Sequence, residues 1–302
     1  MSRSSSSSVG RGVSRVVLVD KPAGWTSYDV IRRAKRGSRE KVGHAGTLDP
    51  FATGLLVVLV GQATRVSSLF MGLPKEYVVT AQFGARSSTG DPTGVVEETA
   101  GDPVTAGDLL PVLDRFRGTI VQRVPMTSAV KVGGEALYRK AQRGERIETP
   151  VREATVYEIS LIDFDATAQR ATLLTRTGKG TYVRTLVEDI GAALGVGAYA
   201  VSLRRTRVGH LSVHDALPGE SVGPGAFAET GVPGIMTLDQ ALAYLPRYDV
   251  EGALAQRAAN GNELVGGPAG MFRVHGPEGL IGVYEGPRGR ARPVVVFAEP
   301  QS

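Results

Sequence analysis

Residues 43–56 hold the side chains whose types and spacing are best suited to chemistry. The segment reads GHAGTLDPFATGLL, so three glycines and a proline give a tight, irregular backbone ahead of an apolar run. That backbone presents one histidine, His44, and one carboxylate, Asp49. A carboxylate on a loop rooted in the core can act as a nucleophile or as a general base. An Asp that precedes a Pro is also a common turn former, so a purely structural turn is the alternative.

Further short patterns combine charged, aromatic and glycine residues. They are DKPAGWTSYD at 20–29, PKEY at 74–77, TGDPTG at 89–94, SAVKVGG at 128–134 followed by Tyr138 and Ala141, GTYVRTL at 180–186, and LRRTRVG at 203–209.

Together with residues 43–56, these patterns resemble the motifs of the bacterial tRNA pseudouridine-55 synthases of the TruB type. That family has D-K-P-x-G-x-T-S-x-D, then G-x-L-D-P-x-A-x-G-L around its catalytic aspartate, K-x-Y, T-x-D-x-x-G, S-A-x-K-x-x-G-x-x-x-Y-x-x-A and G-T-Y-[IV]-R-x-L. The motifs occur here in the same order and cover nearly the whole chain. One departure is VPMT at 124–127, where the family often has a Pro-Pro pair.

The resemblance implies an enzyme that isomerises a uridine in the T-loop of tRNA, at position 55, to pseudouridine. The N-glycosidic bond is cleaved, and the uracil rotates and rejoins the ribose through C5. This chemistry needs no redox change, so neither a cofactor nor a metal is expected. A stacked uridine cannot be attacked, and flipping it into a pocket costs a few kcal/mol. The expected partner is therefore the T-stem-loop of tRNA.

The resemblance also assigns catalytic roles to individual residues. Asp49 is the expected nucleophile, and Tyr77 is expected to stack on the flipped uracil near the proton that moves. Arg184 is expected to form an ion pair with Asp49. An Arg beside an Asp lowers the pKa of the carboxyl, which would keep Asp49 ionised.

Four more residues are expected at the substrate-binding site. Leu203 would form an apolar wall of the base pocket, and His44 would pack against the T-loop. Tyr182 and Lys21 would either contact RNA or support a loop. A basic cluster next to this site is expected to contact phosphates, with a solvated surface as the alternative, and it consists of Arg204, Arg205 and Arg207.

The overall charge agrees with an RNA partner. The net charge is +5 and the pI about 9.5, and residues 1–41 carry ten Lys/Arg against three Asp/Glu. Such a segment neutralises phosphates, although a solubilising tail has the same composition. The chain has no Cys, which excludes disulfides and thiolate chemistry. His210 and His214 stand four apart, but their strand-like surroundings separate them too far for a metal.

The sequence contains no expected membrane span or secretion signal. The longest apolar run, 55–60, is far shorter than the ~20 residues that a spanning helix needs. Residues 1–14 are rich in Ser and Arg and are expected to form a disordered basic tail, with an organelle transit peptide as a weaker alternative. We expect a monomer in the cytoplasm.

The elements that must position these residues alternate between strands and helices. Strands are predicted at 16–19 and 77–83, with 155–164 and 171–177 paired. Helices are predicted at 28–36, capped by Thr26 or Ser27, at 104–116, and at 182–194, ending at Gly195. Residues 90–94 are expected to form a loop, and residues 55–60 are short enough to be strand or helix.

This order predicts an α+β fold with a mixed, largely antiparallel central sheet, flanking helices and a small β-rich C-terminal domain. Pro and Gly cluster at 217–234, which indicates the approach to a boundary, and a helix is expected at 238–245. Short strands are expected at 271–274, 280–284 and 293–297. The expected domains are a catalytic pseudouridine synthase domain at 15–237 and a PUA-like RNA-binding domain at 246–302.

Two rival functions stay open at this point. One is a pseudouridine synthase of different specificity, for example for ribosomal RNA. The other is an RNA chaperone that folds tRNA without catalysis.

Overall fold

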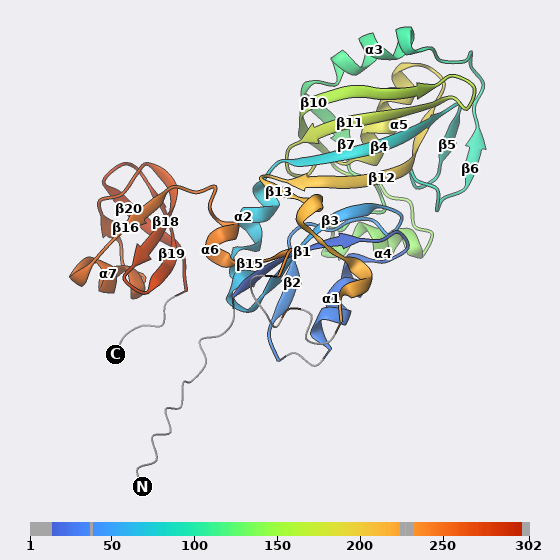
Figure 1. The fold of residues 1–302 in the computed structure, drawn as a ribbon. Coiled ribbons are helices and arrows are strands. Elements are labelled where there is room, and N and C mark those ends of the chain that lie inside the picture. The colour runs from blue at the N-terminus through green and yellow to red at the C-terminus, as the bar shows by residue number, and fades with distance from the viewer. Residues whose placement is uncertain (1–13, 37–38, 224–226, 228–231, 298–302) are drawn as a thin grey trace.

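A single large sheet forms the body of the protein (Figure 1). The computed structural model describes residues 14–36, 39–223, 227 and 232–297. Within them the sheet has eleven strands in the order β14-β1-β3-β12-β4-β11-β10-β7, with β13, β15 and β2 attached to β12, β1 and β3. The β1–β14 and β3–β12 pairs are parallel and the others antiparallel, which confirms the predicted mixed, largely antiparallel sheet. The bounds are β1 Arg15–Lys21, β2 Val42–His44, β3 Thr53–Val60, β4 Lys75–Phe83, β7 Gly118–Arg123, β10 Val151–Asp165, β11 Arg170–Thr177, β12 Ala198–Val208, β13 Leu211–Ser212, β14 Leu217–Pro218 and β15 Ile235–Thr237.

The helices are α1 Ser27–Lys35, α2 Ser67–Gly72, α3 Ala106–Arg115, α4 Leu137–Gln142, α5 Val183–Ala193, α6 Leu238–Ala241 and α7 Gly252–Ala259, with 3-10 turns η1 Gly61–Val66, η2 Val213–Asp215 and η3 Gly219–Ser221. Three of these helices, α1, α3 and α5, confirm the predictions at 28–36, 104–116 and 182–194. Thr26 caps α1, because its side chain accepts from the Asp29 backbone while Asp29 accepts from Thr26 in return. The small hairpins are β5 Ala85–Ser87 with β6 Val96–Glu98, and β8 Lys131–Val132 with β9 Glu135–Ala136.

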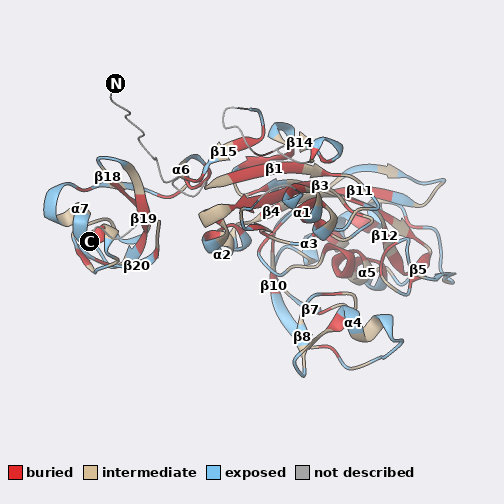
Figure 2. Cartoon of the chain, turned by 90° about the horizontal axis from the view of Figure 1, so that it is seen from below, coloured by how far each residue is buried: buried red, intermediate tan, exposed pale blue. Residues whose placement is uncertain are grey.

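Strand β3 was ambiguous in the sequence because both of its faces are buried (Figure 2). Leu55 and Val57 face an apolar cluster that includes Phe70 of α2. Leu56 and Val58 face the opposite cluster, formed with α1. A strand covered on both faces has no alternation of apolar and polar residues, so its sequence looks the same as a short buried helix. Beyond β12, helices α3 and α5 cover one face of the sheet.

The C-terminal module is a second, five-stranded sheet with its own apolar core. Its elements are β16 Arg247–Asp249, β17 Leu264–Val265, β18 Gly270–Gly276, β19 Gly279–Gly286 and β20 Arg290–Val296, and they confirm the predicted short strands. The module also packs against the body and is hydrogen-bonded to it. Val283 and Val295 share an apolar cluster with Leu242, and Arg273 donates to Asp239 on α6 at 2.5 Å.

Residues 217–218 and 235–237 pair with β1, so both ends of the Pro- and Gly-rich stretch lie at the edge of the main sheet, within the expected catalytic domain at 15–237. One expectation about this region is wrong. The helix expected at 238–245 is shorter, because α6 ends at Ala241 and only turns follow. The expected basic tail lies almost entirely outside the described residues, which begin at 14.

Candidate active site

The loop that carries Asp49 joins β2 to β3, and hydrogen bonds from Gly24 and Ser27 hold its backbone. Ser27, at the start of α1, is 3% exposed and binds the Leu48 backbone twice. Its Oγ accepts from Leu48 N at 2.9 Å and donates to Leu48 O at 3.2 Å. The backbone of Gly24 donates to Pro50 O at 2.8 Å. The DKPAGWTS motif therefore supports the loop that contains the carboxylate.

Lys21 has the same supporting role. Its side chain is fully buried, and Nζ donates to the backbone carbonyls of Trp25 at 2.7 Å and Pro50 at 3.4 Å. Burial lowers the pKa of Lys21 to about 8, while the nearby Asp49 acts in the opposite direction. Of the two roles expected for Lys21, this geometry leaves loop support.

Arg205 anchors the other side of the loop, and its expected contact with phosphate is wrong. The residue is 1% exposed. Its Nε donates to Leu55 O at 2.7 Å and Nη2 to Gly46 O at 3.0 Å. A guanidinium buried under backbone carbonyls cannot reach a phosphate. The two neighbouring arginines are half-exposed and face carboxylates, with Arg204 bound to Asp20 at 2.6 Å and Arg207 at 3.9 Å from Glu76.

The glycine at position 54 is required by the approach of two strands. Gly54 is the second residue of β3, has φ +101°, and lies opposite Arg205 in the parallel β3–β12 pair. A Cβ at this position would stand 2.3 Å from the Arg205 carbonyl oxygen, which no real side chain tolerates. The glycine therefore lets the Asp49 loop lie directly on β12.

Asp49 and Arg184 form a two-point ion pair at this loop, as the resemblance implied. Arg184 Nε lies 2.9 Å from Asp49 Oδ2, and Nη2 lies 3.2 Å from Oδ1. The Arg184 side chain is 3% exposed, whereas that of Asp49 is 32% exposed. The arginine thus holds the carboxylate from inside the protein and leaves it open to a substrate.

A second set of acceptors holds the opposite end of the same guanidinium. Arg184 Nη1 donates to Thr89 O at 2.7 Å and to Thr127 Oγ1 at 2.5 Å, and lies 3.3 Å from Asp91 Oδ2. Asp91 is 7% exposed and also accepts from Thr89 and Thr93 within its turn. The TGDPTG pattern predicted no role for Asp91, and no motif predicted the contact of Thr127 with Arg184. The signal available was a carboxylate in a glycine-flanked turn.

The pKa of Asp49 departs from the expectation. Burial raises it above the ordinary value of a carboxyl, and the Asp91 carboxylate raises it further. Arg184 and Lys21 lower it, but their effect does not outweigh burial. Glu188, one turn after Arg184 on α5, follows the same rule, because burial raises its pKa to about 7. The sequence indicated the ion pair and could not indicate the depth of burial.

Tyr77 and Leu203 lie on the same side of the sheet as the Asp49 loop. Tyr77 pairs with Arg205, and Leu203 with Val79, across β4 and β12. Leu203 belongs to the apolar cluster that includes Leu48 from the Asp49 loop, and the half-buried Tyr77 packs against that cluster. The two side chains thus border the loop from neighbouring strands.

His44 precedes the Asp49 loop, and Tyr182 precedes the helix α5 that carries Arg184. His44 ends β2, and burial together with the Arg205 charge lowers its pKa, which favours the neutral ring. Its Nδ1 is buried and has no hydrogen-bond partner among the described residues. Tyr182 is the N-cap of α5, and the amide of buried Gln122 both accepts from its N and donates to its O. In the part of the chain that the structure describes, no group of His, Asp and Glu could hold a metal ion.

The fold is shared with solved structures. A structure titled a Cbf5–Nop10–Gar1 complex matches with a TM-score of 0.71 and 24% identity, over 95% of this chain and 85% of that one. An H/ACA RNP bound to a substrate RNA containing 2'-deoxyuridine matches with a TM-score of 0.70 and 22% identity, over 95% and 85%. The large sheet with its β-rich module is therefore a fold that this chain shares with these structures.

Sequence comparisons give the family. The TruB family pseudouridylate synthase N-terminal domain matches residues 33–183, and the tRNA pseudouridylate synthase B C-terminal domain matches 184–223. The tRNA pseudouridine synthase B of Aeromonas salmonicida is 38% identical over 91% of both chains. That of Thermobifida fusca is 39% identical over 94% of this chain and 98% of its own. The chain belongs to the TruB family of pseudouridylate synthases.

Proposed function

We propose that this chain isomerises a uridine in the T-loop of tRNA, at position 55, to pseudouridine, with Asp49 as the attacking carboxylate. The observation that carries the proposal is the Asp49–Arg184 pair. It combines a two-point ion pair with a 32% exposed carboxylate on a loop that Ser27, Lys21 and Arg205 hold by hydrogen bonds. Family membership and relatives named tRNA pseudouridine synthase B support tRNA as the substrate.

Each remaining residue then has a place in the reaction. The N1–C1′ bond breaks, the uracil turns, a C5–C1′ bond forms, and the proton lost from C5 is replaced by one gained at N1. Tyr77 stacks on the flipped uracil and stands near the proton transfer, with Leu203 as an apolar wall. His44 and Tyr182 contact the RNA around the position that the flipped base has left. Arg184 keeps the carboxylate aimed at the nucleoside while excluding water from its inner side.

Release of the C5 proton from labelled uridine in tRNA tests the proposal directly. The wild-type protein should release one proton per tRNA, and Asp49→Asn should release none at matched protein concentration. Filter binding serves as the control, because the variant should keep its affinity for tRNA. Binding without release by the wild-type protein would favour the RNA chaperone alternative instead.

Substrate specificity needs a second comparison. An isolated T-stem-loop hairpin should be fully modified, and the same hairpin with cytidine at the target position should release no proton. Modification of a ribosomal RNA fragment in preference to the T-stem-loop would assign the enzyme to a different RNA class.

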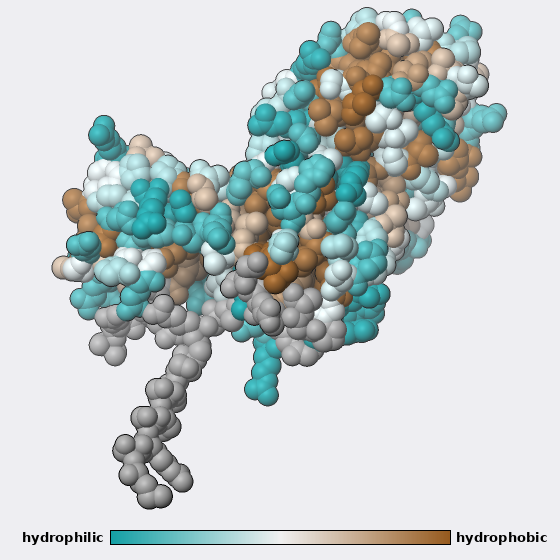
Figure 3. Space-filling model, viewed as in Figure 1, coloured by the Kyte–Doolittle hydropathy of each residue, from teal (hydrophilic) through white to brown (hydrophobic). Residues whose placement is uncertain are grey.

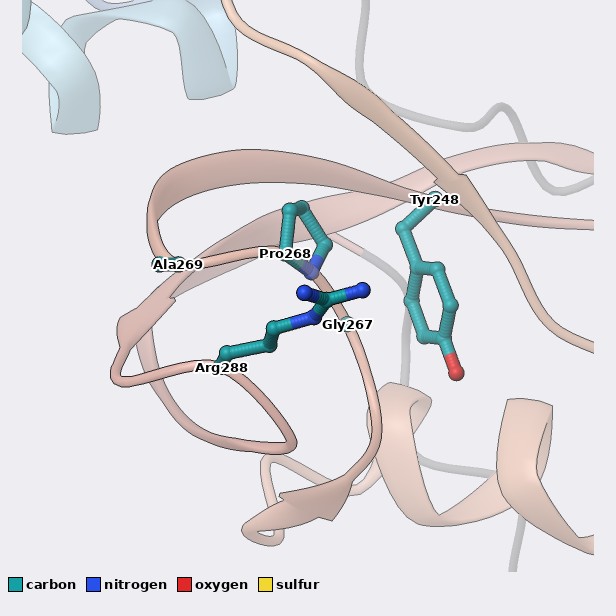
Figure 4. Close-up of a pocket in the computed structure, with 5 residues that line it drawn as sticks. All are labelled: Tyr248, Gly267, Pro268, Ala269 and Arg288. Atoms are coloured by element: carbon teal, nitrogen blue, oxygen red, sulfur yellow. The ribbon is translucent and has the colours of Figure 1, made fainter.

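We further propose that residues 246–297 form a PUA-like module that contacts the tRNA away from the target base, next to a catalytic domain at 15–237. Supporting this, a surface pocket of about 530 Å³ lies between the β16 strand and two loops, and Figure 4 shows Arg288 reaching across it beside Pro268 and Tyr248. The loops are joined by backbone hydrogen bonds from Gly266 to Gly289 and from Gly289 to Gly267. Hydrophilic residues gather on the face of the module drawn in Figure 3.

The pocket suits one nucleotide of RNA. Arg288 forms no ion pair or hydrogen bond among the described residues, so its guanidinium is available to a phosphate or a base plane. Arg288→Ala should weaken binding of full tRNA and reduce its salt slope by about one, with little change for a T-stem-loop hairpin. Arg257→Ala, a matched loss of charge in the same module, should have a smaller effect. An equal loss with both variants would mean that the pocket is not the contact.

The helices among the described residues are all too short or too polar to cross a membrane. We propose that the protein acts as a monomer in the cytoplasm, where tRNA is processed. Light scattering of the purified protein with and without tRNA would test the monomer, and cell fractionation would test the compartment.

A further inference from the structure

The guanidinium of Arg184 is held at two ends by different parts of the chain. One edge, Nε and Nη2, carries the Asp49 carboxylate. The remaining nitrogen, Nη1, is shared by Thr89 O, Asp91 Oδ2 and Thr127 Oγ1. Because a guanidinium is planar and rigid, fixing Nη1 fixes the direction in which the other edge points.

Thr127 differs from the other two acceptors in where it comes from. Thr89 and Asp91 belong to one tight turn, in which Asp91 is bound to its neighbours by several hydrogen bonds. Thr127 lies between β7 and the small hairpin β8–β9, at the root of an arm that carries α4. This arm stands away from the rest of the sheet in Figure 2. Of the three acceptors of Nη1, Thr127 is therefore the one that a separate part of the fold places.

We propose that Thr127 is a positioning residue for the isomerisation, whose hydroxyl fixes Arg184 and thereby aims Asp49 at the substrate. This inference rests on the proposed function of the Asp49 site. The hydroxyl acts at 2.5 Å on a charged donor that is 3% exposed, where a hydrogen bond is worth more than on the surface. Without it, the guanidinium can turn about its remaining contacts in the turn at 89–91, and the carboxylate turns with it.

Replacement of the hydroxyl by a methyl group isolates this contact. Thr127→Val keeps the shape and removes the acceptor, and the single-turnover rate should fall about tenfold to a hundredfold while the Kd for tRNA changes less than about twofold. Thr127→Ser restores the hydroxyl and should recover the rate to within about threefold. Ser128→Ala is the matched control, because the neighbouring Ser128 hydroxyl is buried with no hydrogen-bond partner among the described residues. It should leave the rate within about twofold.

The pH profile gives a readout that packing alone would not move. The charged groups that act on Asp49 are Arg184, Asp91 and Lys21, and Arg184 lowers the pKa of the carboxyl. A less firmly held Arg184 lowers it less, so the pKa of Asp49 rises in Thr127→Val. Activity should then be lost at a higher pH on acidification than in the wild-type enzyme, whereas Thr127→Ser should keep the wild-type profile.

The outcomes separate this inference from the proposed function. If the wild-type enzyme releases no C5 proton from tRNA, the proposed function fails. If it does, a wild-type rate and profile for Thr127→Val overturn the role of Thr127 alone. So do equal losses in the Val and Ser variants, which would indicate packing, or a loss confined to KM, which would indicate RNA docking. If Thr127→Val melts early, Thr127→Ala compared with Thr127→Ser makes the same test.

Discussion

Replacing Arg205 with Met tests whether this residue supports the Asp49 loop or contacts RNA. Its charge and position in the sequence predicted an RNA contact, whereas its burial indicates a supporting role. Arg205 is 1% exposed and lies beneath the Asp49 loop. Its donors reach Leu55 O at 2.7 Å, Gly46 O at 3.0 Å and Thr47 O at 3.5 Å, so they bracket the loop on both sides of Asp49. Met fills much of the space of the arginine stem and removes every donor.

The size of the effect follows from those contacts. Two carbonyls at good distance lose their side-chain donor, and each buried acceptor left unsatisfied costs about 1–3 kcal/mol. Part of this is returned, because a buried guanidinium without an acidic partner is itself expensive to desolvate. We expect the free energy of unfolding to fall by about 2–4 kcal/mol. The catalytic rate should fall with it, because the loop that aims Asp49 loosens.

Urea denaturation and the proton-release assay together measure both consequences. Arg207→Met is the matched control, since Arg207 is on the same strand with a side chain 50% exposed and 3.9 Å from Glu76. Its free energy of unfolding should change by less than about 0.5 kcal/mol. The Kd of Arg205→Met for tRNA, measured at urea concentrations well below its unfolding transition, should stay near that of the wild-type protein.

One result would refute this reasoning. If Arg205→Met unfolds at the wild-type urea concentration but binds tRNA more weakly and with a smaller salt slope, the side chain contacts phosphate in the complex. The buried geometry of the free protein would then not be the one that binds RNA.

Four other changes test separate parts of the structure. Asp49→Asn should abolish proton release and leave the Kd for tRNA within about tenfold, since affinity comes from many phosphate contacts; turnover near wild type would contradict its role. Tyr77→Phe should lower the rate about 10²–10⁴-fold if the phenol moves a proton, and Tyr77→Leu should lose a further ~1–3 kcal/mol of stacking. A lower melting temperature in both variants would show instead that the tyrosine is purely structural. Ending the chain after Arg247 should lower the Tm of the body as well as tRNA binding, because Val283 is removed from a shared apolar cluster; an unchanged Tm would show that the body folds independently. Burial raises the pKa of Glu188 from 4.5 to about 7, so the free energy of unfolding of the wild-type protein should fall, relative to Glu188→Gln, as the pH rises from 4.5 to 7. The difference should level off above pH 7, and parallel stability curves for the two proteins would contradict the shift.

The sequence determined most of the elements, because caps and periodicity are short local patterns. The sequence predicts Thr26 or Ser27 as the cap of α1, and in the structure Thr26 is the cap, with Asp29 completing a capping box. Alternating β-formers predicted β4, and helical spacing predicted α5 up to Gly195. The pairing of Asp49 with Arg184 came from the resemblance to a family, and the structure brings them to 2.9 Å across 135 positions of sequence.

Only the tertiary structure decided which charges are buried and what they touch. Three arginines of one strand look alike in sequence, yet a parallel neighbour and the loop above it bury Arg205. The net pKa of Asp49 depends on burial as well as on Arg184, and burial is a property of all surrounding chain segments. Asp91 and Thr127 meet Arg184 because a turn and the root of an arm converge on it. Such convergence depends on contacts between distant segments, which no local pattern in the sequence records.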